Sequence, residues 1–335
     1  MIRLLISFCL LAPVALHAQT PAAEPDYRTE EVRYANGDVA LAGLLMLPDA
    51  RGPVPGTVII QGSGRSDRTN PWARAIAEEL VRAGVAVLLT DKRGSGASGG
   101  DWQIAGFDDL AGDALAGLAA LRARPEIDPA RVGLAGLSQG GWIAPLAASR
   151  SPDVAFVIDV SGAAVSYAEQ SFHEMGNTAR QAGLSDAAVA EVLALNRAAG
   201  EYLIDGDWAA YEQARQHALG TDARPVAEGF PAARDARIWT FLRKSYAYDP
   251  MPYWIVLRQP VLVLLGADDE QDNVPVATSV QRLRSGFASA GKRNGRVVVI
   301  PGAGHSFIDD STRELMPAFT QALAEWVRTE VVAAR

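Results

Sequence analysis

The feature that most constrains this sequence is a serine-centred motif between an apolar run and a helical segment. The pattern predicts a buried strand over residues 132–135 and a helix over residues 143–149, with Gly136-Leu-Ser138-Gln-Gly140 between them. A G-x-S-x-G motif in this context is typical of a sharp turn that exposes a serine at a helix N-terminus. Because the turn is strained, it requires small neighbours, and Gly136 and Gly140 supply them. We therefore predict that Ser138 is a nucleophile.

Outside this motif, short apolar strands alternate with helices from Gly56 onwards. An opening hairpin is expected over residues 30–47, with its turn at Asn36-Gly37. Further strands are expected over residues 57–60, 85–89, 154–160, 260–265 and 297–300, and helices over residues 71–83, 108–122, 276–290 and 312–331. Near-continuous apolar strands separated by helices predict an α/β fold with a mostly parallel central sheet and helices on both faces.

The alternation stops between about Val165 and Gln259. This stretch is mostly helical and rich in aromatic residues, most of which are expected to pack within it. Elements inserted before a late strand project from the C-terminal edge of a parallel sheet, where ligands bind. We predict that residues 165–259 form a helical cap over the site, between core segments 27–164 and 260–331.

His305 is the predicted general base. Three histidines follow the N-terminal segment, namely His173, His217 and His305. Only His305, in Gly304-His-Ser306, follows a late strand, so it alone can lie over Ser138 and accept its proton. The other two fall in the cap, and their spacing forms no metal site.

The acid that orients His305 is expected in the loop after residues 260–265. That loop offers Asp268, Asp269 and Asp272. Asp269 is favoured because the third residue after the glycine is the usual place, and Asp272 remains the alternative.

The loop after residues 57–60 is expected to supply half of an oxyanion hole. Its sequence is Gln61-Gly-Ser-Gly64. The backbone N–H of Ser63, with Gly62 as the alternative, and that of Gln139 are the predicted donors. Trp142, close to the nucleophile, is expected to line the substrate pocket.

Two charged residues of the same loop are expected to stabilise it. Asp67 and Arg68 lie shortly after the glycines. We expect them to hold the loop through an ion pair rather than to touch substrate.

The charge and the N-terminus limit the possible partners. A net charge of −8 argues against nucleic acid or an anionic membrane as a partner. Residues 1–18 carry Arg3, then an apolar run, and a cleavage site after Ala18, which predicts a signal peptide and a periplasmic or secreted protein. Cys9 is the only cysteine, so the mature chain is expected to have no thiol nucleophile, disulfide or cysteine metal site.

One motif favours a different class of protein. Gly94-Ser-Gly-Ala-Ser-Gly99 fits the G-x-G-x-x-G pattern of dinucleotide-binding folds. However, the chain from this motif to Arg122 is expected to form a loop and a helix, so the acidic residue required at the end of the next strand is missing. We therefore expect a tight loop at the rim of the sheet.

With these residues assembled, the chain from Glu31 to Val331 resembles the α/β-hydrolase superfamily. The order Ser138, Asp269, His305 is that family's order. The hairpin, the Gly-Ser-Gly loop followed by Asp-Arg, the Asp-x-Arg-Gly-x-Gly-x-Ser loop and the Gly-x-Gly-His segment are similar to those of bacterial secreted esterases of the dienelactone-hydrolase and acyl-aminopeptidase branches. Gln61 stands where many relatives have histidine, and the acid loop is longer than usual.

The resemblance implies a serine esterase that acts on small-molecule esters without a cofactor or a metal. An aromatic pocket would favour short to medium neutral acyl groups. Related peptidases and thioesterases, and a non-catalytic binding protein of hydrolase descent, are the alternatives.

Overall fold

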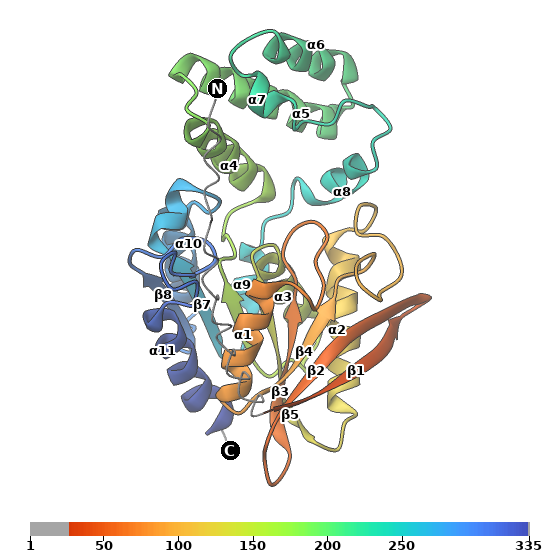
Figure 1. Cartoon of the computed structure of the whole chain (residues 1–335), viewed down its shortest axis with the longest axis vertical. Coiled ribbons are helices and arrows are strands. Elements are labelled where there is room, and N and C mark those ends of the chain that lie inside the picture. Colours follow the sequence, from red (N-terminus) through yellow and green to blue (C-terminus); the bar gives the residue numbers. More distant parts are fainter. Residues whose placement is uncertain (1–26, 334–335) are drawn as a thin grey trace, which may run out of the picture.

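The computed structural model describes residues 27–333, so the predicted signal peptide and Cys9 lie outside the described residues. Its centre is an eight-stranded sheet with the order β1-β2-β4-β3-β5-β6-β7-β8 (Figure 1). β2 pairs antiparallel with β1 and β4, and the remaining pairs are parallel. The strands are β1 (Tyr27–Asn36), β2 (Val39–Pro48), β3 (Val54–Ile60), β4 (Ala86–Asp91), β5 (Ile127–Leu137), β6 (Val157–Val160), β7 (Val261–Gly266) and β8 (Gly295–Ile300). The predicted mostly parallel α/β sheet is confirmed.

The predicted hairpin is present as β1 and β2. Asn36 pairs with Val39 across the turn. Gly37 has φ +55°, a left-handed conformation that glycine adopts without steric cost. The glycine therefore fixes the register of the opening hairpin.

Helices cover both faces of the sheet because neighbouring residues of each strand point to opposite sides. In β3, Val58 belongs to the apolar cluster beneath α2 (Phe107–Arg122), α3 (Gly140–Arg150), α9 (Met251–Val256) and α10 (Val276–Ser289). The next residue, Ile59, belongs to the cluster beneath α1 (Pro71–Arg82), α11 (Pro317–Trp326) and the π-helical segment η2 (Val327–Val332). Both clusters are fully buried, so the sheet is the middle layer of three.

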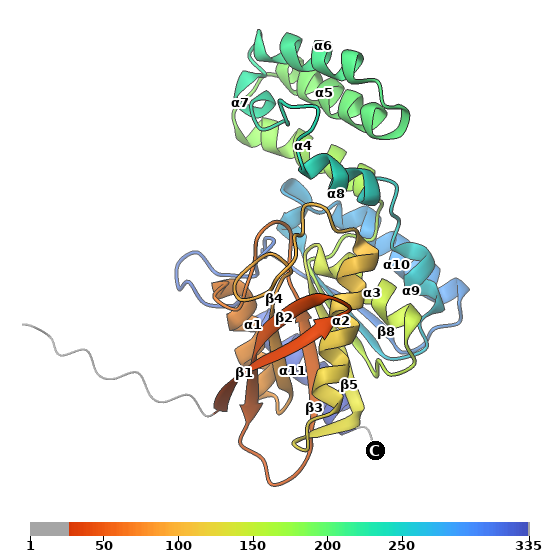
Figure 2. The same cartoon turned by 90° about the vertical axis from the view of Figure 1, so that its right-hand side faces the viewer.

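A separate group of helices lies above one end of the sheet (Figures 1 and 2). These are α4 (Tyr167–Gln181), α5 (Asp186–Asp205), α6 (Trp208–Leu219), α7 (Arg224–Ala227) and α8 (Ile238–Ser245). They enclose an apolar cluster of their own that includes Tyr202, Tyr211 and Trp239. We call α4–α8 the cap. α9 instead packs against α3 and α10, so the core resumes before residue 259.

The closing helix α11 begins later than predicted. It starts at Pro317 rather than Thr312, because residues 308–315 form a loop closed by a bridge between Ile308 and Leu315. Proline suits this first position since it lacks the N–H that a first turn leaves unpaired. Within residues 27–333, no helix is long and apolar enough to cross a membrane.

Candidate active site

Ser138 lies in the turn between β5 and α3, as the motif predicts. Its φ is +52°, a left-handed conformation that is costly for any residue other than glycine. Its backbone N–H donates to the carbonyl of Val160 at the end of β6, at 2.8 Å. The strained turn is thus fixed to the neighbouring strand, and the serine is only partly buried.

The two motif glycines are required by close backbone approaches. A Cβ on Gly136 would lie 2.2 Å from the carbonyl oxygen of Gly140. A Cβ on Gly140 would lie equally close, 2.2 Å, to the carbonyl oxygen of Ile60. Both contacts involve backbone atoms that cannot rotate away, so any larger residue would displace the turn.

His305 and Asp269 form a hydrogen-bonded pair beside this turn. Nδ1 of His305 lies 2.7 Å from Oδ2 of Asp269. Asp269 is 0 % exposed and the His305 side chain 19 %, so the pair is shielded while the imidazole stays accessible. The hydroxyl of Ser161 donates to the His305 carbonyl at 2.6 Å. Because Ser138 is held by Val160 and His305 by Ser161, consecutive residues at the end of β6 fix both segments.

Asp269 reaches His305 because its loop folds as a short 3-10 helix, η1 (Ala267–Gln271). Its other oxygen, Oδ1, accepts the backbone N–H of Asn273 at 3.2 Å. Asp272, the sequence alternative, has its side chain turned to the amide of Asn273, at 3.0 Å. The structure therefore pairs His305 with Asp269 and not with Asp272.

The acid loop is also held by the cap. Asn177 of α4 donates to the carbonyl oxygens of Glu270 and Asp272, each at 3.1 Å. Gln181, one turn further on, donates to the carbonyl of Gln271 at 2.8 Å. Three consecutive carbonyls of the loop that carries Asp269 thus depend on two cap side chains.

The Gln61–Gly64 loop lies against Ser138. A Cβ on Gly62 would be 3.5 Å from the Cβ of Ser138 and 4.0 Å from its hydroxyl oxygen. Gln61 is buried, and its amide donates to the carbonyls of Thr90 (2.9 Å) and Asp67 (3.1 Å). A glutamine therefore holds this loop where many hydrolases of the fold have histidine. Ser63 is exposed, and Gln139 is buried at the start of α3.

The predicted ion pair between Asp67 and Arg68 is wrong. Arg68 instead pairs with Asp91, at 2.7 Å, and with Glu31 of β1. Asp67 caps its own turn by accepting from the backbone N–H of Thr69. Asp91 is the preferred partner of Arg68 because it is almost fully buried and presents both carboxylate oxygens to the guanidinium.

Trp142 does not reach an open pocket. It is 3 % exposed, and its indole N–H donates to the carbonyl of Ala163. Its ring packs on Phe107 and Tyr167 instead. Its position on α3 directs it into the core, so Tyr167, which also lines a cavity in the cap, stands between it and that cavity.

The remaining sequence candidates lie in the cap or in the loop after β4. His173 contacts Asn177 on α4, and His217 lies on α6, largely exposed. Among the described residues, no cluster of three or more His, Cys, Asp or Glu side chains is arranged to hold a metal. The Gly94–Gly99 loop closes on β2 through a bond from Gly99 to Ala40, and α2 begins only at Phe107, so these glycines do not open a helix as a dinucleotide site requires.

The sequence profile of the X-Pro dipeptidyl-peptidase (S15) family matches residues 36–286, well over half of the chain. The chain belongs to the S15 family. It is a serine hydrolase of the α/β fold. The match includes Ser138 and Asp269 and ends before His305. No curated protein sequence matches closely enough to count as a relative.

Solved structures similar to this S15 family member share its fold. An esterase of Pyrococcus furiosus has a TM-score of 0.61 at 17% identity, over 95% of this chain and 97% of its own. The Est1E protein of Butyrivibrio proteoclasticus, with ferulic acid bound, has a TM-score of 0.57 at 21% identity, over 90% and 99%. A dienelactone hydrolase of Anabaena variabilis has a TM-score of 0.52 at 19% identity, over 91% and 99%. The expected α/β-hydrolase fold is confirmed.

Three residues near the S15 site carry no motif in the sequence. Trp72 of α1 lies 5.6 Å from the His305 ring, measured between centroids. Glu174 of α4 faces the acid loop: burial raises its pKa, the carboxylates of Asp272 and Asp269 add to that shift, and His305 opposes it. Lys92, after β4, is buried beside the Gln61–Gly64 loop. Only the tertiary fold brings these side chains to the site.

Proposed function

We propose that the protein is a serine esterase that hydrolyses carboxylic esters of small, mainly neutral acyl groups through an acyl-enzyme on Ser138. The supporting observation is the strained Ser138 turn fixed to the same strand end as the paired His305 and Asp269. An accessible serine, a base and a buried acid that orients the base are the parts that nucleophilic acyl transfer requires.

In the proposed cycle, Nε2 of His305 takes the proton of the Ser138 hydroxyl as its oxygen attacks the ester carbonyl. The tetrahedral oxyanion accepts hydrogen bonds from the backbone N–H groups of Gln139 and of Ser63 or Gly62. When the intermediate collapses, the C–O bond to the alcohol breaks and His305 donates its proton to the alcohol. Water, deprotonated by His305, then attacks the acyl-enzyme, releases the acid and restores Ser138. Asp269 remains ionised and orients the ring.

We assign the acyl group to a cavity in the cap, and the lining of this cavity favours neutral groups. A cavity of about 620 Å³ lies between α4, α5, α7 and α8. Its walls include Met175, Leu203, Val226 and Trp239, and no acidic or basic side chain of residues 27–333 lines it. An ionised group entering such a cavity would lose its hydration without gaining a partner. No cofactor or metal takes part in the proposed reaction.

A series of p-nitrophenyl esters from acetate to dodecanoate tests this assignment. On protein lacking residues 1–18, kcat/KM should peak at a short or medium neutral acyl chain and should not change with chelator. A succinyl monoester of similar length should be at least about tenfold poorer, since its charge would be buried unpaired. A preference for the anionic ester, or loss of activity with chelator, would contradict the proposed pocket.

A peptidase is the second candidate, because the matching family is that of X-Pro dipeptidyl-peptidases. Glu174 favours it, since a carboxyl facing the site could bind the N-terminal ammonium of a peptide. Ala-Pro-p-nitroanilide belongs in the same assay for this reason. A kcat/KM for it above that of the best ester would make the peptidase the better assignment.

We also propose that residues 1–18 direct export and are removed after Ala18. Expression of the full chain in a bacterial host, followed by fractionation, should yield a periplasmic protein whose N-terminal sequence begins at Gln19. Recovery in the cytoplasm with an intact N-terminus would refute export.

A further inference from the structure

Lys92 is a buried lysine whose ammonium group has two neutral acceptors. It lies directly after β4 and is 6 % exposed. Its Nζ donates to the carbonyl oxygen of Gly62 at 2.8 Å and to Oε1 of Gln139 at 2.7 Å. The ring of Trp102 lies 5.5 Å from it, in a cation–π contact. No ion pair to Lys92 occurs among residues 27–333.

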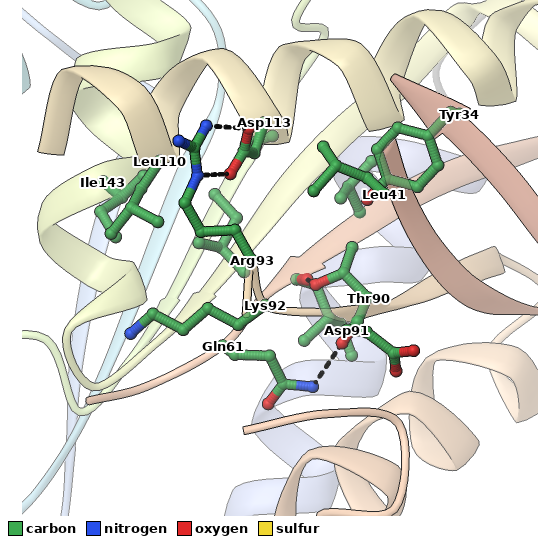
Figure 3. A pocket seen from close by; sticks show the side chains of 14 residues that line it. Tyr34, Leu41, Gln61, Thr90, Asp91, Lys92, Arg93, Leu110, Asp113 and Ile143 are labelled. Atoms are coloured by element: carbon green, nitrogen blue, oxygen red, sulfur yellow. Dashed lines mark hydrogen bonds and ion pairs between the residues drawn. The ribbon is translucent and has the colours of Figure 1, made fainter. Parts of the chain in front are cut away.

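The charged groups around Lys92 are engaged elsewhere. On the neighbouring residues of its own loop, Asp91 pairs with Arg68 and Arg93 with Asp113. Figure 3 shows the Lys92 side chain extending away from the Arg93–Asp113 pair and from the Asp91 carboxylate. On the other packed elements, Asp101, next to Trp102, pairs with Arg237, and Arg65, directly after the Gln61–Gly64 loop, donates to the carbonyl of Gly94. Burying a cation without a counter-ion costs free energy of folding. Stability therefore does not explain why a lysine occupies this position.

The two acceptors belong to the two halves of the proposed oxyanion hole. The carbonyl of Gly62 and the N–H of Ser63 are parts of one planar trans peptide, so they point in opposite directions. A donor that holds the carbonyl from one side therefore aims the N–H to the other side and polarises it. Gln139 is the residue whose backbone N–H is the second donor, and Lys92 holds its side chain. One ammonium group thus ties together both segments.

We propose that Lys92 is a positioning residue that holds the Gly62–Ser63 peptide and Gln139 at the spacing an oxyanion requires. This inference rests on the proposed function, and it adds a residue that acts through the backbone donors rather than on the substrate. Its charge also stabilises the oxyanion, because a positive group behind both donors lies in a site of low dielectric.

Deprotonation of Lys92 removes its charge but keeps its hydrogen bonds, so the two contributions can be measured separately. Burial lowers the pKa of Lys92 to about 7. Above that pH the neutral amine still has two N–H groups for its two acceptors, so the positions hold while the charge is lost. The advantage that Lys92 confers should therefore be largest below pH 7 and smaller, but not absent, at pH 9.

The test compares Lys92→Met with wild type on the best p-nitrophenyl ester from pH 6 to pH 9. We expect kcat to fall about 10- to 100-fold with KM within about threefold, since the lost stabilisation acts on the transition state. The ratio of wild-type to variant kcat should shrink as the pH rises, because only the wild type loses the Lys92 charge over this range. Affinity for phenylboronic acid, which forms a tetrahedral adduct on the serine, should weaken in parallel.

Lys292→Met is the matched control. Lys292 also has a pKa lowered by burial, and its ammonium donates to the carbonyls of Leu257 and Gln259 far from Ser138. It should keep wild-type kcat at every pH. Lys92→Gln retains a neutral donor, so it should lose less kcat than Lys92→Met, and its ratio to wild type should still shrink as the pH rises. It replaces the methionine variant if that variant loses its cooperative thermal transition.

Each outcome bears on a different claim. A Lys92→Met enzyme within about threefold of wild-type kcat would overturn the positioning role while leaving the esterase intact. A larger loss whose size is independent of pH would support positioning through the hydrogen bonds and overturn the contribution of the charge. An equal loss in Lys292→Met would also overturn the positioning role, because the effect would then be one of stability. Wild-type protein that neither hydrolyses esters nor reacts with a fluorophosphonate would instead refute the proposed function.

Discussion

Replacing Ser138 by alanine is expected to lower kcat for ester hydrolysis by about 10⁴- to 10⁶-fold, because no other group can form the acyl-enzyme. The protein should still unfold at the wild-type temperature, since alanine fits wherever the serine side chain fits. Steady-state hydrolysis of a p-nitrophenyl ester and covalent labelling by a fluorophosphonate probe measure the two consequences of the same loss. Labelling should disappear together with activity.

Ser149→Ala is the control for this change. Ser149 lies on the same helix, α3, and its exposed hydroxyl donates only to the carbonyl of Leu146. The Ser149→Ala protein should react with the fluorophosphonate probe and hydrolyse the ester as wild type does. A Ser138→Ala protein with wild-type activity would show that the hydrolysis uses another nucleophile.

The second large effect is expected at the acid. Asp269→Asn should lower kcat about 10⁴-fold, because an amide that donates to Nδ1 of His305 selects the tautomer that cannot accept the serine proton. The bond to be lost is the 2.7 Å contact between Oδ2 of Asp269 and Nδ1 of His305. Measuring both kcat and the circular dichroism spectrum on the same sample separates this effect from misfolding of the buried acid loop.

Asp272→Asn is the paired variant in the same loop. Its side chain contacts Asn273 rather than His305, so activity should stay within about threefold of wild type. If Asp272→Asn were the more damaging change, the acid would have to be reassigned to Asp272.

What the sequence predicts well here is local. The apolar strands, the glycines around Ser138 and the Asn36-Gly37 turn depend on neighbours within a few positions, and the structure contains them. Gly136 and Gly140 are predictable because a turn this tight leaves no space for a Cβ, whatever surrounds it. Steric limits that involve only neighbouring residues can therefore be predicted from the sequence.

What the sequence leaves open depends on the conformation of a loop or the phase of a helix. Asp269 and Asp272 are three residues apart, and the η1 helix decides which of them faces His305. Trp142 lies close to Ser138 along the chain, yet the phase of α3 turns it into the core. Likewise Arg68 binds Asp91, which is distant in sequence, instead of the adjacent Asp67.

Residues brought from other elements carry no motif at all. Nothing local distinguishes Lys92 from a solvated lysine at the rim of the sheet, because its burial arises from the Gln61–Gly64 loop, Gln139 and Trp102 together. Glu174 and Asn177 belong to a cap helix, and the acid loop belongs to the core. Their nearness to each other is a property of docking between two segments.

The bonds from Asn177 and Gln181 to the acid loop have a consequence for modular engineering of this enzyme. A chimera that takes its cap from another hydrolase would leave the carbonyls of Glu270, Gln271 and Asp272 without their donors unless the graft reproduces these two amides. Each carbonyl that the new cap shields from water without a donor costs about 1–3 kcal/mol, and the loop that would relax to recover it is the one that carries Asp269. Replacing the cap at the ends of α4 is therefore expected to change substrate preference and turnover together.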